Sequence, residues 1–264
     1  MALAAGDGML WKVQAENGTT SYLFGTIHVD DARVTALAEP VNVALAAADL
    51  FMMEVLPSGD MSPYLMPGSL EQLLTETELE QVYAAAEFHG LPHEMVSHMK
   101  PWLLAMVFDL PVAQSPYTLD IQLYLQAQRA GKKIKALETP QAHFAALESI
   151  SLDEQLLILR SVLKRSQAQK EKDFELLIQA YLSGDIHQVA ALDAEMTADD
   201  LPASLWEKLR VKLLDERNMH MAEHIAAVAG QQSVFVAVGA AHLPGERGII
   251  DLLNRAGWVV TPVK

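Results

Sequence analysis

The chain has 264 residues, a formal net charge of −15 at pH 7, 51% hydrophobic residues and 20% charged residues. This balance is typical of a folded globule with an ample core and argues against disorder. Because phosphate backbones would be repelled and no run of Lys and Arg reverses the charge, we expect no nucleic-acid partner. No apolar stretch approaches the roughly 20 residues of a transmembrane helix, which predicts a soluble protein without an integral membrane segment.

The chain contains no cysteine. Any metal ion would therefore be held by His, Asp, Glu or backbone oxygens. The Ala-rich opening MALAAGDG is too short for a signal peptide but is typical of what remains after one is removed. Export to the periplasm is one interpretation, and a cytoplasmic location is the alternative.

The first 115 residues begin with a strand, a helix and a second strand. TSYLFG, residues 20 to 25, is rich in β-formers, and residues 33 to 48 have a helical period despite Pro40. LFMMEV, residues 50 to 55, is a short apolar strand that carries Glu54. This order predicts a parallel sheet. Residues 60 to 115 are helical in pattern, with a pause at Gly90 and Pro92.

The rest of the chain returns to the sheet twice. An amphipathic helix over 118 to 130 precedes the strand KKIKALE, which ends on Glu138, and residues 141 to 230 are helical with breaks near Gly184 and at 199 to 202. SVFVAVG and WVVTPV are the last strands. We predict an α/β fold with a central, mostly parallel sheet flanked by helices. One domain would have its sheet core in about 11–59, 116–140 and 205–264, with helical insertions at about 60–115 and 141–204.

The same small pattern stands near both ends of the chain. FGTIHV places Gly25 three residues before His28, and VGAAHL places Gly239 three residues before His242. Both follow predicted strands, as do Glu54 and Glu138. Because ligands collect at the carboxyl edge of parallel strands, these side chains should converge there.

Two imidazoles with one or two carboxylates can bind zinc, manganese or cobalt and leave a position for water. Such an ion acidifies its water and polarises a carbonyl, so hydrolysis is the natural chemistry, with a remaining carboxylate as general base. A structural interpretation exists for each motif, because a histidine after a strand is often only hydrogen-bonded and an acid often caps a helix. The pair at matching strand exits favours function.

Several segments together resemble the TraB/GumN family, which is similar to the TIKI metalloproteases. They are FGTIHV, Glu54 after its strand, LDIQLYLQAQRAGKKIKALET, DERNMHMAEHI and VFVAVGAAHLPGERGIIDLLNRAGWVV, and the resemblance begins at about Trp11. It implies the α/β fold of the erythromycin esterase/ChaN-like group. It also implies a metal-dependent peptidase with a peptide or protein substrate, favouring Mn²⁺ or Co²⁺, with Zn²⁺ as a further candidate.

The resemblance also implies roles for particular residues. The expected catalytic residues are His28, Glu54, Glu138, Arg217 and His242. Gly25, Gly239 and Asn218 are expected to support ligand binding, and the expected metal ligands are His28, Glu54 and His242. Arg217 would bind a substrate carboxylate or an oxyanion, or would instead pair on the surface with Asp215 or Glu216.

Other interpretations remain open. His220, Glu223 and His224 spell the inverted zinc-protease order H-x-x-E-H, although no clear third ligand follows. The histidines in HGLPHEMVSHMK, at positions 89, 93 and 98, are better explained as surface residues at a hinge. The alternatives in function are a non-enzymatic haem- or peptide-binding protein and a metal-independent esterase with His28 as base.

Overall fold

A computed structural model describes residues 8–198 and 200–263 as a six-stranded sheet between helices. The strand order is β4-β3-β5-β2-β1-β6; β4, β3, β5 and β2 run parallel, and β1 is antiparallel to both of its neighbours. The predicted α/β fold with a mostly parallel sheet is confirmed. Residues 1–7, which hold most of the proposed leader remnant, lie outside the described residues. The strands are β1 (Leu10–Gln14), β2 (Thr20–Thr26), β3 (Leu50–Met53), β4 (Lys133–Ala136), β5 (Val234–Gly239) and β6 (Val259–Pro262).

The strand β1 was not predicted. It forms a hairpin with β2, in which Leu10 pairs with Phe24 and Gln14 pairs with Thr20. Gly18, in the connecting turn, has φ of +85°, a conformation that glycine adopts without steric cost. The Asn-Gly pair at 17 and 18, between two β-rich segments, was the signal that could have revealed this hairpin.

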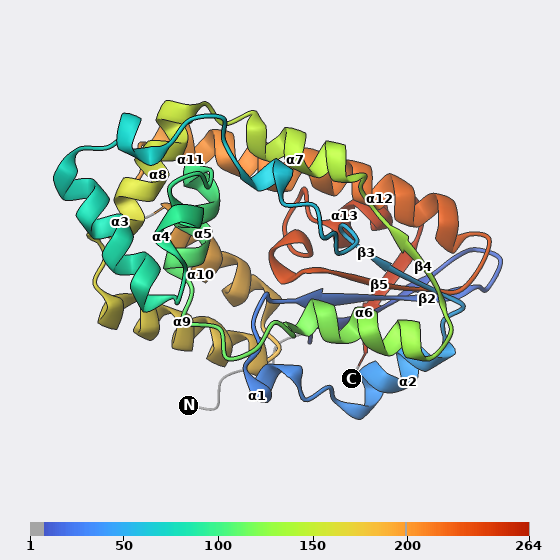
Figure 1. The fold of residues 1–264 in the computed structure, drawn as a ribbon. Helices are drawn as coiled ribbons and strands as arrows, with labels where there is room; N and C mark the ends of the chain where they lie inside the picture. Colours follow the sequence, from blue (N-terminus) through green and yellow to red (C-terminus); the bar gives the residue numbers. More distant parts are fainter. Residues whose placement is uncertain (1–7, 199, 264) are drawn as a thin grey trace, which may run out of the picture.

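Helices cover both faces of the sheet (Figure 1). α2 (Glu39–Ala47) and α6 (Leu119–Arg129) lie on one face, and α12 (Glu216–Ala229) lies on the other and packs on α13 (Ile249–Arg255). The single helix predicted over 33–48 is wrong, because α1 (Ala32–Thr35) and α2 are separate. Pro40 lies in the first turn of α2, where its missing N–H has no helical partner to lose.

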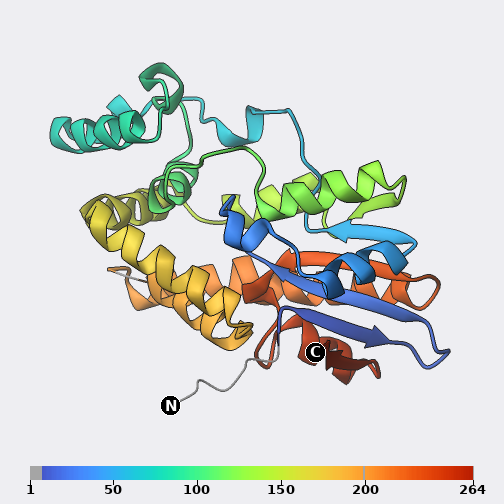
Figure 2. The same ribbon diagram turned by 90° about the horizontal axis from the view of Figure 1, so that it is seen from below.

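The two predicted helical insertions pack on each other. Leu104 and Phe108 of α5 share a hydrophobic cluster with Leu156 and Leu159 of α8. Figures 1 and 2 place the resulting helical lobe beyond the carboxyl ends of the parallel strands.

Within the described ranges, no helix is long and apolar enough to cross a membrane. The remaining helices are α3 (Glu76–Phe88), α4 (His93–Val96), α5 (Pro101–Asp109), α7 (Pro140–Glu148), α8 (Leu152–Lys164), α9 (Gln167–Leu182), α10 (Ile186–Ala198) and α11 (Ala203–Arg210), with short turns η1 (Ser62–Tyr64), η2 (Leu70–Gln72), η3 (Val211–Asp215) and η4 (Ala240–His242).

Candidate active site

The two G-x-x-H patterns lie side by side, at the exits of the neighbouring strands β2 and β5. A Cβ atom on Gly25 would lie 2.9 Å from Leu243 Cδ1 and 3.2 Å from Ala240 Cα, so the missing side chain lets the second pattern pack on the first. A Cβ atom on Gly239 would lie 3.4 Å from both Glu54 Oε1 and His242 Cδ2. Gly25 therefore allows the two turns to pack closely together, whereas Gly239 lies directly against the side chains of Glu54 and His242.

A buried guanidinium joins the two predicted carboxylates. Arg217 Nη2 donates to Glu54 Oε2 at 2.5 Å and to Glu138 Oε2 at 2.6 Å, and Arg217 Nε donates to Glu138 Oε2 at 2.9 Å. The side chains of Arg217, Glu54 and Glu138 are 11%, 14% and 5% exposed. Arg217 thus faces the strand ends rather than the neighbouring acids Asp215 and Glu216.

The position of Arg217 follows from an irregular helix turn. η3, immediately before α12, is a π-helical turn, and Arg217 Nη1 donates to the Leu213 carbonyl within it at 3.1 Å. Such turns are rare in proteins overall, but many of those that occur lie at functional sites. Because an extra residue rotates the following side chains by about 100° around the axis, the turn changes which side chains of α12 face the sheet.

His242 is held in one tautomer by Asn218. Asn218 Nδ2 donates to the Arg247 carbonyl at 2.9 Å, so Oδ1, 2.6 Å from His242 Nδ1, is the acceptor of that ring N–H. The lone pair of His242 is then on Nε2, which lies 3.4 Å from Arg217 Nη1 and 3.7 Å from Glu54 Oε2. Burial lowers the pKa of His242 to about 4, so the ring is neutral at pH 7.

His28 belongs to a second polar group at the exit of β2. Its Nδ1 lies 2.8 Å from Asp120 Oδ2, and Thr26 Oγ1 donates to Asp120 Oδ1 at 2.5 Å. The attraction of Asp120 raises the pKa of His28 above its usual value, although 61% of the side chain is exposed and water screens the effect. Among the described residues, no hydrogen bond or ion pair joins His28 to Glu54 or His242.

Asp120 and Thr26 were missed in the sequence. Asp120 stands in the first turn of α6 and shares its buried face with Leu119, Leu123 and Ala127. An acid inside the apolar stripe of an amphipathic helix was therefore the available signal.

The buried cluster carries a net negative charge. Burial opposes ionisation of Glu54, but the Arg217 guanidinium and the Gly239 N–H bring its pKa below the usual value. Burial also opposes ionisation of Glu138, whose pKa is lowered by His143 and Arg217. Two carboxylates with one guanidinium and a neutral His242 leave one negative charge uncompensated, which favours a cation nearby.

The donors fit a divalent metal ion in kind, and His242 and Glu54 also fit it in protonation, whereas His28 would first have to lose the proton that Asp120 stabilises. His28 and His242 each bind an oxygen through Nδ1, and histidines that bind a metal through one ring nitrogen commonly bind an oxygen through the other. Two ligands about 2.1 Å from a tetrahedral ion lie about 3.4 Å apart, close to the 3.7 Å between His242 Nε2 and Glu54 Oε2. Arg217 contacts the same two atoms and would have to shift. Across residues 8–198 and 200–263, no three His, Asp or Glu side chains are arranged to hold an ion, so the set His28, Glu54 and His242 stays a prediction.

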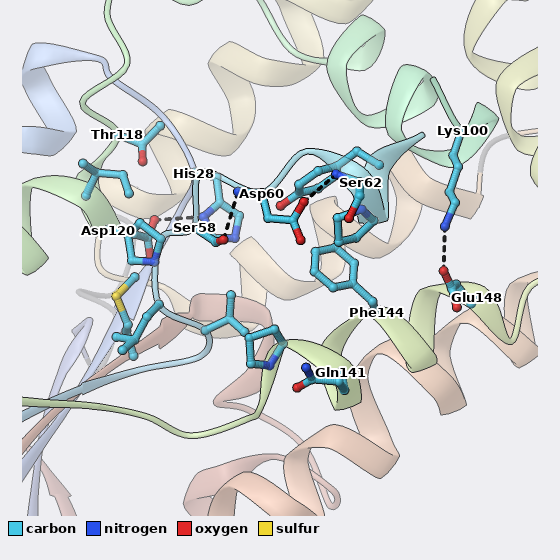
Figure 3. Close-up of a pocket in the computed structure, with 18 residues that line it drawn as sticks. His28, Ser58, Asp60, Ser62, Lys100, Thr118, Asp120, Gln141, Phe144 and Glu148 are labelled. Atoms are coloured by element: carbon cyan, nitrogen blue, oxygen red, sulfur yellow. Dashed lines mark hydrogen bonds and ion pairs between the residues drawn. The ribbon is translucent and has the colours of Figure 1, made fainter. Parts of the chain in front are cut away.

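A cavity of about 680 Å³ opens beside His28 (Figure 3). Met53 and Val55, on either side of Glu54 in the chain, line it, and so does Pro140, two residues after Glu138. The cavity therefore lies over the same strand ends that carry the predicted site residues.

The competing histidine groups lie elsewhere. His220, Glu223 and His224 are on the exposed side of α12, and His224 Nδ1 lies 2.5 Å from the Leu137 carbonyl. The other group lies around α4: His89 follows α3, His93 begins α4, and His98, just after α4, contacts the Gly68 carbonyl through Nδ1 at 3.0 Å.

Comparison with known proteins agrees with the resemblance seen in the sequence. The chain is similar to Metalloprotease TIKI1 of Danio rerio (23% identical, covering 96% of this chain and 63% of the relative) and to Metalloprotease TIKI2 of Xenopus tropicalis (24%, 96% and 59%). It therefore spans only about 60% of the length of these relatives. It is also similar to the uncharacterized protein YbaP of Escherichia coli strain K12 (26%, 88% and 87%). Residues 9–262 match the family described as TraB/PrgY/gumN, and the chain belongs to that family.

Proposed function

We propose that the protein is a metal-dependent hydrolase of peptide bonds, whose divalent ion is held by His242, Glu54 and His28. The observation that carries this proposal is the buried, net negative cluster in which a neutral His242 Nε2 lies 3.7 Å from a Glu54 oxygen. The open cavity is lined by His28 and by Met53 and Val55, which flank Glu54 in the chain. The TIKI relatives, which are named metalloproteases, support the same reaction class.

The surrounding residues would orient the ligands. Asn218 fixes the lone pair of His242 on Nε2, and the Gly239 N–H donates to Glu54 Oε1 at 2.8 Å, which leaves Oε2 toward the histidine. A bound ion would polarise the scissile carbonyl and make a water molecule more acidic. Mn²⁺ and Co²⁺ are the first candidates and Zn²⁺ the next, because imidazole and carboxylate donors without thiolates suit all three.

Arg217 and Glu138 have a supporting role in this proposal. Glu138 binds the guanidinium through Nε and Nη2, which leaves Arg217 Nη1 near His242. Displaced by the ion from Glu54 and His242 but still held by Glu138, this cation would stabilise the oxyanion that forms when the carbonyl is attacked. Glu138 would then act by positioning Arg217.

A metal-independent hydrolase is the second candidate, and one specific contact favours it. Arg217 contacts the Glu54 and His242 atoms that an ion would use, and so can itself supply positive charge there. His28, held by Asp120, would be the general base once it has lost its proton.

Metal dependence separates the two candidates. The chain is treated with a chelator, its metal content is measured, and cleavage of a peptide library is followed by mass spectrometry before and after adding Mn²⁺, Co²⁺ or Zn²⁺. We expect cleavage that is lost with the chelator and restored by one ion in wild type but not in His242→Ala. Full cleavage without metal would overturn the first candidate in favour of the second, and no cleavage under any condition would overturn both.

A further inference from the structure

The cavity beside His28 has an aromatic wall. Tyr64 of η1 and Phe144 of α7 meet edge to face, with ring centroids 5.1 Å apart and planes at 89°. Tyr64 also packs on Trp102, a buried residue of α5, with centroids 6.1 Å apart. Tyr64 and Phe144 are only partly buried and line the cavity, so a fixed aromatic surface faces the open space.

Charged side chains also line the cavity, and most of them are paired. Lys100 is paired with Glu148 at 2.6 Å, and His28 is paired with Asp120 at 2.8 Å. The structure describes every residue that lines the cavity. Among these residues, Asp60 is the one whose charge has no ionic partner. Its Oδ1 accepts from the Ser62 N–H at 2.9 Å, which lowers the pKa of Asp60 and keeps it ionised at neutral pH.

The aromatic wall and Asp60 lie near the residues of the proposed active site. In the view of Figure 3, Asp60 projects between His28 and the Phe144 ring. Tyr64 and Asp60 belong to the segment that follows Glu54, and Phe144 lies six residues after Glu138. A volume of about 680 Å³ falls within the range of about 300–1,000 Å³ found for ligand sites.

From these features we infer that the cavity is the subsite that selects the substrate, and that it takes a peptide in which an aromatic or large aliphatic residue adjoins a basic one. The apolar side chain packs on Tyr64 and Phe144, and the basic group binds Asp60. An anionic ligand is disfavoured because the unpaired charge of the lining is itself negative. The inference rests on the proposed function for the cleavage of the bound peptide, but binding itself requires no cleavage.

Binding of four matched peptides tests this selectivity. The peptides differ only in a central Phe-Arg, Phe-Glu, Gly-Arg or Gly-Glu pair, and their affinity for the metal-free chain is measured by calorimetry. We expect Phe-Arg to bind most tightly. Phe144→Ala should weaken Phe-Arg binding roughly threefold to tenfold and remove the preference for Phe over Gly, with Phe144→Leu in between.

Asp60→Asn should instead remove the preference for Arg over Glu, a roughly twofold to fivefold effect that declines with added salt. Phe88→Ala, at an exposed aromatic outside this cavity, and Glu80→Gln, at an exposed acid of α3, are the matched controls and should leave all four affinities unchanged. Equal affinity for the four peptides, or equal effects of Phe144→Ala and Phe88→Ala, would overturn the inference.

The outcome is separable from that of the proposed function. Selective binding without cleavage would contradict the hydrolase and leave the subsite standing. Cleavage that is indifferent to Phe144 and Asp60 would do the reverse.

Discussion

Asn218 determines which nitrogen of His242 faces the site. Its amide nitrogen donates to the Arg247 carbonyl, so its oxygen, 2.6 Å from His242 Nδ1, must accept the ring proton. The loop that follows the second G-x-x-H pattern thereby orients, through one side chain, the histidine of that pattern.

Removing this amide should impair activity more than stability. Without Asn218 the ring of His242 can rotate or change tautomer, and loss of such a partner typically costs 10–100-fold in activity or metal affinity. We expect a decrease of that order in kcat/KM for Asn218→Ala. Asn42→Ala removes an asparagine with similar backbone contacts in α2 and should keep full activity. Equal activities of the two variants would contradict the proposed role.

Arg217 should contribute strongly to the stability of the folded state at neutral pH. Its removal leaves the buried carboxylates of Glu54 and Glu138 uncompensated, which costs about 3–5 kcal/mol when one partner of a buried pair is lost. Urea unfolding of Arg217→Ala at pH 7 should show a decrease of this size. Arg217→Lys should recover only part of it, because an ammonium cannot bind both carboxylates with the same planar geometry.

The same variant should reverse the effect of acid on stability. In wild type, the lowered pKa values of Glu54 and Glu138 contribute stability above the pKa values of the unfolded chain, about 4.3, and this is lost as the pH falls toward the folded values. In Arg217→Ala, burial should raise both pKa values, so lowering the pH from 7 to 5 should stabilise it. Parallel stability profiles of the two proteins would show that Arg217 does not control these carboxylates.

The two motif glycines should respond differently to alanine. Gly25→Ala places a Cβ atom 2.9 Å from Leu243 Cδ1 and 3.2 Å from backbone at Ala240, and overpacking of this kind typically costs about 1–3 kcal/mol. Gly239→Ala makes contacts of 3.4 Å at an ordinary φ of −51°, so its stability should change by less than about 0.5 kcal/mol. Because these contacts are to Glu54 and His242, its activity should still decrease. Thermal unfolding with a peptide-cleavage assay measures both effects.

Asp120 should set the pH dependence of activity. It raises the pKa of His28, and a protonated imidazole is neither a metal ligand nor a base, so activity should increase as the pH rises through that pKa. Asp120→Asn removes the charge and should move this rising limb to lower pH by roughly 1 to 3 units, while the maximum activity decreases. NMR titration of the His28 ring in both proteins measures the pKa directly. An unchanged pKa in Asp120→Asn would contradict this role.

The arrangement of the strand ends could be predicted from the sequence. His28, Glu54, Glu138 and His242 each follow a strand, and parallel strands end at one edge, so the shared location needed only the order of the elements; His28 nevertheless pairs with Asp120 rather than with the other three. The single helix predicted over 33–48 was wrong because a helical period does not reveal where a helix is interrupted, and Pro40 lies in the first turn of the second helix.

Other parts of the site depend on tertiary contacts that no local pattern contains. Asp120 meets His28 only because the first turn of α6 packs against the exit of β2, 92 residues away in the chain. The pairing of Arg217 with both carboxylates depends on a π-helical turn, and a helical period gives no sign of one.

The haem-binding alternative stays a prediction, which titration with haem and absorbance in the Soret region would test.

The proposed function requires His28 and His242 to serve one peptide-cleaving site. The most direct test is cleavage of a peptide library, with Mn²⁺ present, by wild type, His28→Ala, His242→Ala and the surface control His220→Ala, all checked for folding by circular dichroism. We expect wild type and His220→Ala to cleave the library and the other two variants to be folded but to lose cleavage. Undiminished cleavage by folded His28→Ala or His242→Ala would contradict it.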